Sequence, residues 1–232
     1  MRCEQSMNDY TFTLGGAELH ARPSGALWWP SKGLLCVSDL HFGKAARIAR
    51  RSGGMLPPYE GQDTLDRLEA ELDATGARHV ICLGDSFDDM QAAGSLPEDL
   101  GAWLLRLIAG RDWAWVEGNH DPGPIDLPGT HRAEIALGPL VFRHIAQPGA
   151  EGEVSGHYHP KARLGFRGGA VARPCFLIDG RRVVLPAFGT YTGGLCSTSP
   201  VLCALMDDDA RAVMTGSAAH AIPMPRVLRR RA

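Results

Sequence analysis

Aspartate, histidine and asparagine recur in five short polar clusters, and each cluster directly follows an apolar stretch of the chain. The clusters are DLH at 39–41, DSFDD at 85–89, NHD at 119–121, the single His144, and HYH at 157–159. Carboxylate, imidazole and amide oxygen together suit Mn, Fe or Zn better than Mg or Ca, which prefer shells of oxygen alone. The clusters therefore predict a transition-metal centre, with enough ligands for two ions that share a bridging carboxylate.

The spacing inside two of these clusters predicts paired ligands. Alternate residues of an extended segment point to the same side, so Asp39 and His41 can reach one ion together. His157 and His159 can do the same, and Gly156 before them lets the backbone come close to its neighbours. The two pairs are interpreted as two-pronged metal ligands.

Each cluster taken alone has an ordinary structural interpretation as well. Asn-His-Asp at 119–121 can form a turn, because Asn and Asp suit turns. A single histidine on an apolar strand, such as His144, is more often a core residue than a ligand. The metal hypothesis depends on the ordered set, which uses five of the nine histidines. The other four are interpreted as structural or exposed: His20, His79, His131 and His220.

The elements that must position these clusters are short buried strands and two helices. Continuous apolar runs predict strands at 33–38, 78–84 and 111–118, and leucine spacing predicts a helix at 60–75. A second helix is predicted at 97–110, where it begins on Pro97 and ends on Gly110. Most of the chain after 130, including HRAEIAL at 131–137, has the character of strands. This order indicates a layered α/β fold, in which ligands bind outside the carboxyl ends of the strands.

The length, net charge and composition of the chain restrict the class of protein. The chain has 232 residues with a formal net charge of −2, so one domain spanning 1–232 is expected, without a global field that attracts nucleic acid or membranes. No stretch is apolar enough for a signal peptide or a membrane span, which predicts a soluble cytoplasmic protein with no membrane partner.

No cysteine pair has CxxC spacing, so a zinc knuckle is not expected. The basic segment 222–232 is predicted to be a flexible tail.

The ordered motifs DLH, GDSFD, GNHD, His144 and GHYH closely resemble those of the calcineurin-like metallophosphoesterases. The resemblance implies a four-layer α/β/β/α sandwich of two mixed β-sheets flanked by helices, with a two-metal centre. It implies Asp85 as the ligand that bridges the two ions. It also implies three further ligands for each ion: Asp39, His41 and His159 for the first, and Asn119, His144 and His157 for the second.

The same resemblance implies the catalytic residues. His120 is expected to stand beside the leaving group, and Asp121 is expected to orient it. Asp88 matches a second acidic position of the family, next to the ligands rather than on the metal.

A narrower likeness concerns SDLHFGK at 38–44 and LPAFGTYTGG at 185–194. These stretches resemble the bacterial phosphoesterases associated with ATP-dependent DNA ligases, the PdeM-type nucleases. The likeness implies phosphodiesterase or endonuclease action on DNA with manganese, with Fe or Zn as alternatives. It also implies a DNA ligase and a helicase of a repair system as partners. The second stretch can equally be a glycine-supported turn.

Three functions remain open on the sequence. The first is a phosphodiesterase or endonuclease acting on DNA, the second is a phosphatase or phosphodiesterase for small or cyclic nucleotides, and the third is a metal-stabilised repair scaffold with little turnover. Lys44, Arg47 and Arg51 share one face of a predicted helix and are candidate phosphate contacts. That face can equally be an ordinary solvated surface. The His120–Asp121 pair argues against the scaffold, which needs neither residue.

Overall fold

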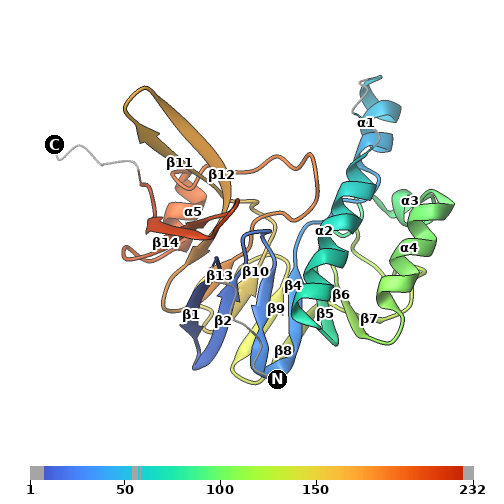
Figure 1. The fold of residues 1–232 in the computed structure, drawn as a ribbon, viewed down its shortest axis with the longest axis horizontal. Coiled ribbons are helices and arrows are strands. Elements are labelled where there is room, and N and C mark those ends of the chain that lie inside the picture. The colour runs from blue at the N-terminus through green and yellow to red at the C-terminus, as the bar shows by residue number, and fades with distance from the viewer. Residues whose placement is uncertain (1–7, 54–56, 58, 227–232) are drawn as a thin grey trace.

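The computed structural model describes residues 8–53, 57 and 59–226. Its strands form two sheets, and Figure 1 shows helices on the outer side of each.

The first sheet has seven strands, which lie in the order of the sequence. The strands up to β4 are antiparallel to their neighbours, whereas β4, β5, β6 and β7 run parallel. The parallel half therefore gathers its carboxyl ends along one edge of the sheet. The strands are β1 (Tyr10–Leu14), β2 (Ala17–Ala21), β3 (Leu27–Trp29), β4 (Leu34–Val37), β5 (His79–Leu83), β6 (Asp112–Val116) and β7 (Thr130–Arg132).

The second sheet has the order β15-β14-β12-β13-β10-β9-β8. Here β9, β10 and β13 are parallel to each other and the other pairs are antiparallel, so both sheets are mixed. The strand β11 lies outside this order and pairs with β12. The strands are β8 (Glu134–Leu137), β9 (Leu140–Arg143), β10 (Glu153–Ser155), β11 (Lys161–Phe166), β12 (Gly169–Ile178), β13 (Arg182–Val184), β14 (Arg211–Met214) and β15 (His220–Pro223).

The helices cover the outer faces of both sheets. The two long helices, α2 (Glu60–Thr75) and α4 (Glu98–Ile108), contact each other and pack on the first sheet, while the short α5 (Pro200–Leu205) packs on the second. Figure 1 shows α1 (Lys44–Ser52) and the β11–β12 hairpin projecting on the same side of the molecule. The remaining pieces are η1 (Pro30–Lys32) and α3 (Met90–Ala93).

Three apolar clusters fill the spaces between the layers. Leu68 of α2 belongs to the cluster between the helices and the first sheet. Leu83 and Phe142 belong to the cluster between the two sheets. Leu202 of α5 belongs to the cluster between this helix and the second sheet. All four side chains are buried. Burying apolar side chains on both faces of each sheet is the main stabilising contribution to such a sandwich. The predicted four-layer α/β/β/α architecture is confirmed.

One predicted strand is divided between the two sheets. The stretch 131–137 was expected to be continuous, but it breaks at Ala133, where β7 of the first sheet ends and β8 of the second begins. The backbone N–H of Glu117 donates to the carbonyl of Arg132, which holds the end of β7 against the first sheet. The chain therefore crosses from one sheet to the other within one residue.

The start of the predicted tail belongs to the fold. Residues 222 and 223 lie in β15, and Met224 is buried. The guanidinium of Arg226 donates to the carbonyl oxygens of Cys203 and Met206, at 3.1 and 2.9 Å. The prediction of a flexible tail from 222 is therefore wrong for 222–226, and the rest of that tail, 227–232, lies outside the described residues. Among the described helices, none has the length and apolar character needed to cross a membrane.

Candidate metal centre

The predicted ligands follow strands of both sheets. Asp39 and His41 follow β4, Asp85 follows β5 and Asn119 follows β6, all in the first sheet. The second sheet supplies His144 after β9, and His157 and His159 after β10. Neighbouring parallel strands end at one edge, and the two sheets face each other, so the structure brings these side chains together at one place.

Asp39, His41 and His159 form a first cluster. Their candidate ligand atoms all lie within 4.8 Å of one another. Nε2 of His159 is 2.9 Å from Oδ1 of Asp39 and 3.4 Å from Nε2 of His41. Two imidazole nitrogens and a carboxylate oxygen therefore converge on a common point.

Asp85, His144 and His157 form a second cluster, whose candidate ligand atoms also lie within 4.8 Å of one another. Nε2 of His144 is 3.3 Å from Oδ2 of Asp85 and 3.2 Å from Nδ1 of His157. The amide oxygen Oδ1 of Asn119 lies 3.0 Å from the same nitrogen of His144. This cluster therefore contains the carboxylate, imidazole and amide donors that the sequence indicated.

Asp85 lies between the two clusters. Its Oδ2 atom is 3.3 Å from Nε2 of His144 in the second cluster and 4.0 Å from Nε2 of His41 in the first. One carboxylate oxygen thus faces both groups of histidines, which is the place where a bridging ligand must stand.

The outer ring nitrogens show that the donor set fits metal ligation. Nδ1 of His144 is 3.0 Å from the carbonyl oxygen of Leu83, and Nδ1 of His41 is 2.9 Å from Oδ1 of Asp88. In metal-binding histidines the nitrogen away from the metal is held by a carbonyl or a carboxylate in this way. Both histidines therefore turn Nε2 toward the centre, and the residues present fit divalent transition metals.

The backbone around these side chains is not extended, which corrects the expectation for the two ligand pairs. A left-handed conformation is uncommon for residues other than glycine and clusters at functional sites. Tyr191 (φ 61°) is the remaining such residue in the described part of the chain. The others are all predicted ligands: Asp39 (φ 55°), His41 (49°), Asp85 (46°), His157 (72°) and His159 (45°).

At Asp39 and His41 this conformation accompanies pairing between the loops that follow β4 and β5. The backbone N–H of Asp39 donates to the carbonyl of Gly84, and that of His41 donates to the carbonyl of Asp85. These bonds turn the chain at each ligand. The side chains of Asp39 and His41 still reach the same cluster, but through a tight turn rather than through strand alternation.

Gly156 makes room for the first cluster, as the sequence predicted. A Cβ atom at this position would stand 1.8 Å from Oγ of Ser38 and 2.6 Å from Oδ2 of Asp39. The next backbone N–H, that of His157, donates to the same Oδ2 atom at 3.0 Å. The Ser38 hydroxyl also donates to it, a contact that the sequence did not reveal.

A sequence model of the calcineurin-like phosphoesterase family matches residues 33–173, which include all of these ligands. The chain belongs to the calcineurin-like phosphoesterase family. Its structure is similar to the crystal structure of Pseudomonas putida nuclease MPE, with a TM-score of 0.71 and 28% sequence identity over 93% of this chain and 100% of that chain. Yfce, a phosphoesterase from E. coli, gives a TM-score of 0.40 and 13% identity over 83% of this chain and 99% of that chain. No curated protein matches the chain significantly.

In this phosphoesterase, His120 stands at the edge of the metal centre. Its Nδ1 atom lies 2.8 Å from the carbonyl oxygen of Asp88, and its Nε2 atom lies 4.0 Å from Oδ2 of Asp85. The side chain is 32% exposed, so its inward nitrogen is within reach of solvent and of a bound molecule.

Asp121 does not orient His120, which corrects the expected role. Its two carboxylate oxygens accept the backbone N–H groups of Asp85, Ser86, Phe87 and Gly118, at 2.8 to 3.1 Å. These four bonds fix the loop after β5 to the loop after β6. Asp121 therefore holds the backbone that carries Asp85, and the carbonyl of Asp88 holds His120.

Asp88 connects the metal centre to α1. It is fully buried, and its Oδ1 atom lies 3.9 Å from Nζ of Lys44 while its Oδ2 atom contacts Nε of Arg47. Burial acts to raise the pKa of Asp88, but the hydrogen bonds of His41 and Arg47 lower it to about 2. Lys44 and Arg47 thus face Asp88 beside the ligands, and of the three candidate phosphate contacts only Arg51 is exposed.

Neighbouring histidines favour the ionised form of the carboxylates of the centre. Burial acts to raise the pKa of Asp85, but hydrogen bonding and charge from His144 lower it to about 2. Burial likewise opposes ionisation of Asp39, while the hydrogen bond from His159 makes the net shift of its pKa downward. The pKa of His144 is raised in turn, because the interactions with Asp85 and Asp39 outweigh its burial. Negative charge is therefore already fixed where cations would bind.

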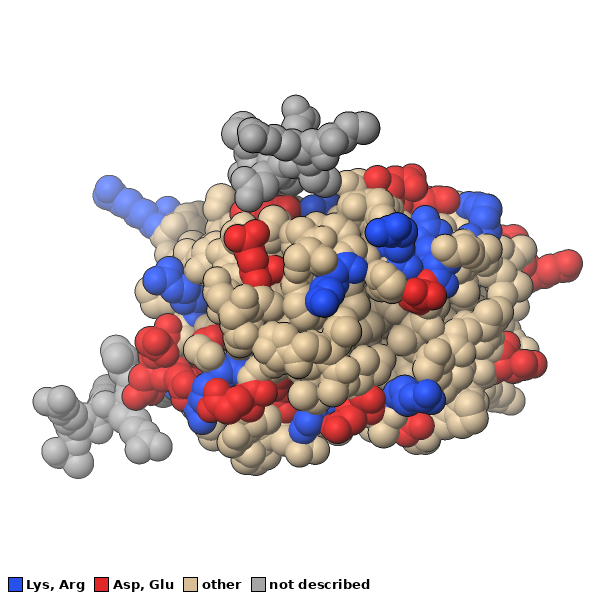
Figure 2. Space-filling view, turned by 90° about the horizontal axis from the view of Figure 1, so that it is seen from below, with Lys and Arg blue, Asp and Glu red and all other residues tan. Residues whose placement is uncertain are grey.

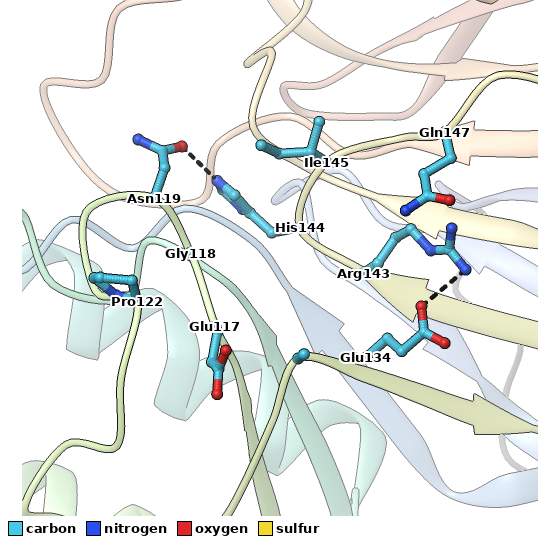
Figure 3. A pocket seen from close by; sticks show the side chains of 10 residues that line it. Glu117, Gly118, Asn119, Pro122, Glu134, Arg143, His144, Ile145 and Gln147 are labelled. Carbon is cyan, nitrogen blue, oxygen red and sulfur yellow. Dashed lines mark hydrogen bonds and ion pairs between the residues drawn. The ribbon is translucent and has the colours of Figure 1, made fainter.

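A pocket of about 390 Å³ opens beside the second cluster. Figure 3 shows Asn119 and His144 at one end of it and Arg143, paired with Glu134, at the other. Ile145, the residue after His144, is 44% exposed and also lines the pocket. The pocket gives space for a group larger than a phosphate next to the ligands.

Proposed function

We propose that this phosphoesterase is a two-metal phosphodiesterase that cuts nucleic acid, with DNA as its substrate. The observation that carries the proposal is the position of Asp85, whose Oδ2 atom faces the histidines of both clusters. Similarity to the P. putida nuclease over all of that protein supports a nucleic-acid substrate. Manganese is the proposed metal, because the donor set mixes nitrogen and oxygen.

Two bound ions would supply Lewis acidity, which activates water and neutralises charge on the phosphoryl oxygens. The protein residues then have separate tasks. Asp85 and the histidines keep their ligand atoms turned inward through the hydrogen bonds described above. Arg47 and Lys44 neutralise the buried charge of Asp88 beside the centre.

His120 is proposed to protonate the leaving oxygen. The carbonyl of Asp88 holds the Nδ1 atom of His120. The proton transferred to the leaving oxygen is therefore proposed to come from Nε2, which faces the centre. An alkoxide is a poor leaving group without a proton, so a positioned acid increases the rate for DNA.

A panel of metals and substrates tests the proposal. Plasmid DNA, single-stranded DNA, a 2′,3′-cyclic nucleotide and an aryl phosphodiester would each be incubated with Mn, Mg and Zn. We expect cleavage of DNA and of the aryl ester with Mn. Turnover of the cyclic nucleotide without cleavage of either DNA would contradict the proposal.

The pocket in Figure 3 favours a second candidate, a phosphodiesterase for small nucleotides. Its volume of about 390 Å³ is within the range typical of small-molecule sites, and it opens at the ligands Asn119 and His144. The cyclic nucleotide in the panel tests this candidate. A repair scaffold with little turnover predicts that every substrate is left intact. Association with a DNA ligase and a helicase stays a prediction, to be tested by co-purification.

A further inference from the structure

The β11–β12 hairpin is a projecting element that starts at the metal centre. Lys161, the first residue of β11, comes two residues after His159. Beyond Ala162, the strand β11 and the turn at 167–168 are exposed, and β11 pairs along its length with β12. Figure 1 shows the hairpin extending from the body on the side where α1 projects.

The hairpin contains basic residues and no acidic residue. Lys161, Arg163, Arg167 and Arg173 lie in it, and the stretch 156–178 contains no Asp or Glu. Within the described part of the chain, its three arginines form no ion pair. By contrast, Arg47 and Arg50 of α1 are paired with Asp88 and Asp89. Among the described arginines of these two elements, those without an ion pair are therefore the three of the hairpin and Arg51 of α1.

Charge elsewhere on the surface is mixed. Figure 2 views the molecule from below, away from the side where α1 and the hairpin project, and shows Lys and Arg interspersed with Asp and Glu. Across the whole chain, 24 basic residues are balanced by 26 acidic residues. The hairpin thus departs from the general distribution of charge.

The two faces of the hairpin carry different basic residues. Side chains of a strand alternate between its faces, so Lys161 and Arg163 share one face, while Ala162 and its cross-strand partner Arg173 share the other. Nζ of Lys161 donates to the carbonyl of Thr192, which places the Lys161 face against the loop at 189–195.

That loop in turn lies on the ligand residues. A Cβ atom on Gly194 would stand 2.1 Å from the carbonyl oxygen of His159, and one on Gly189 would stand 2.0 Å from the carbonyl oxygen of Leu40. Further along the same face of the hairpin, Arg163 is opposite Ala172 and Gly165 is opposite Ala170. Small residues around an arginine leave room for an extended polyanion to approach the strand.

We infer that the Lys161–Arg163 face of the hairpin, continued by Arg167 at its turn, binds the phosphate backbone of the nucleic-acid strand cut at the metal centre. The inference rests on the proposed function and specifies its substrate as a polymer. The six residues of β11 extend roughly 20 Å. Phosphates along one strand of duplex DNA are about 3.4 Å apart, so this length corresponds to about six phosphates. A mononucleotide is too short to use this surface.

The test compares two substitutions on opposite faces of the hairpin. One variant combines Arg163→Glu and Arg167→Glu, and the matched control is Arg173→Glu. For each protein with Mn, kcat/KM would be measured on a 12-nucleotide single strand, on a dinucleotide and on an aryl phosphodiester across a range of salt concentrations. Thermal unfolding would establish that each variant is folded.

We expect the double variant to lose selectivity for the 12-nucleotide strand over the dinucleotide. The slope of log(kcat/KM) against log salt for the long strand should become shallower by about 1.4, since each lost phosphate contact accounts for about 0.7. The Arg173→Glu control should keep the wild-type slope and selectivity.

Two results would overturn the inference alone. One is a double variant that still cleaves DNA with the wild-type salt slope and the wild-type selectivity. That result would show that the basic face does not bind the substrate and would favour an acidic protein as its partner. The other is an equal loss in the Arg173→Glu control, which would show a general field rather than a binding face. A wild-type protein that hydrolyses the aryl ester but neither oligonucleotide would instead contradict the proposed function, and this inference with it.

Discussion

Asp85 is the residue on which the two ligand clusters depend, since its Oδ2 atom faces His41 on one side and His144 on the other. Asp85→Asn removes the negative charge while keeping the shape of the side chain. We expect loss of turnover on every substrate and a fall in the number of bound Mn ions per protein, measured by metal analysis after gel filtration. Asp112→Asn, at an exposed carboxylate paired with His79, is the control. Full activity with two bound ions in Asp85→Asn would contradict the two-metal proposal.

His120 and Asp121 are neighbours with different tasks, and their variants should separate activity from stability. His120→Ala loses one hydrogen bond, worth about 0.5–1.5 kcal/mol, whereas Asp121→Ala leaves four buried backbone N–H groups without their acceptor, at about 1–3 kcal/mol for each group that stays unpaired. We expect Asp121→Ala to lower the free energy of unfolding by several kcal/mol in urea titrations. A similar small loss in both variants would contradict the structural role of Asp121.

His120→Ala should discriminate between leaving groups. A nitrophenolate needs little protonation, while the alkoxide released from DNA needs it, so the variant should lose more activity on DNA than on an aryl phosphodiester. The measurement is the ratio of kcat values for the two substrates, with bound metal determined in the same samples. An equal loss on both would leave His120 a positioning role only.

At the scale of elements, the junction between β10 and the first cluster depends on Gly156. A Cβ atom there collides with Ser38 and with the Asp39 carboxylate, so Gly156→Ala must displace a ligand of the first cluster. We expect loss of most activity and of about one bound metal ion. Gly101→Ala in α4 is the matched control, because nothing lies within 4 Å of its added Cβ atom. Wild-type activity in Gly156→Ala would contradict the packing described here.

The elements that the sequence predicted are those defined by local patterns. The helix at 60–75 and the apolar strands β4, β5 and β6 follow from leucine spacing and continuous hydrophobic runs. The ligand positions follow as well, because they stand where those runs end. The β11–β12 hairpin was missed, since the glycines at 165, 168 and 169 interrupt any strand pattern.

What sequence patterns could not show depends on contacts between distant segments. The left-handed conformation of Asp39 arises from a hydrogen bond to Gly84, which is 45 residues away. The acceptor role of Asp121 arises from the loop after β5, and the inward orientation of Arg47 arises from Asp88. None of these partners can be read from the residues beside them.

At the scale of the whole molecule, metal binding should stabilise the fold. At a concentration 100 times its dissociation constant, an ion that binds only the folded protein adds about 2.7 kcal/mol to the free energy of unfolding. We expect Mn to raise the melting temperature and EDTA to reverse the increase, measured by calorimetry. Asp39→Asn should show a smaller increase than the wild type. An unchanged melting temperature across Mn concentrations would contradict binding at this centre.

Each ligand cluster takes side chains from both sheets: His159 joins Asp39 and His41, and Asp85 joins His144 and His157. An ion in either cluster is therefore a removable cross-link between two layers that also meet through apolar side chains. Backbone amides in β4 and β10 are more than 100 residues apart in the chain, yet their hydrogen exchange should slow together when Mn is added. Amides in β1, at the far edge of the first sheet, should respond less. Mass spectrometry of exchanged peptides would thus show hydrogen exchange in two distant halves of the chain slowing together when Mn is added and recovering together when it is removed.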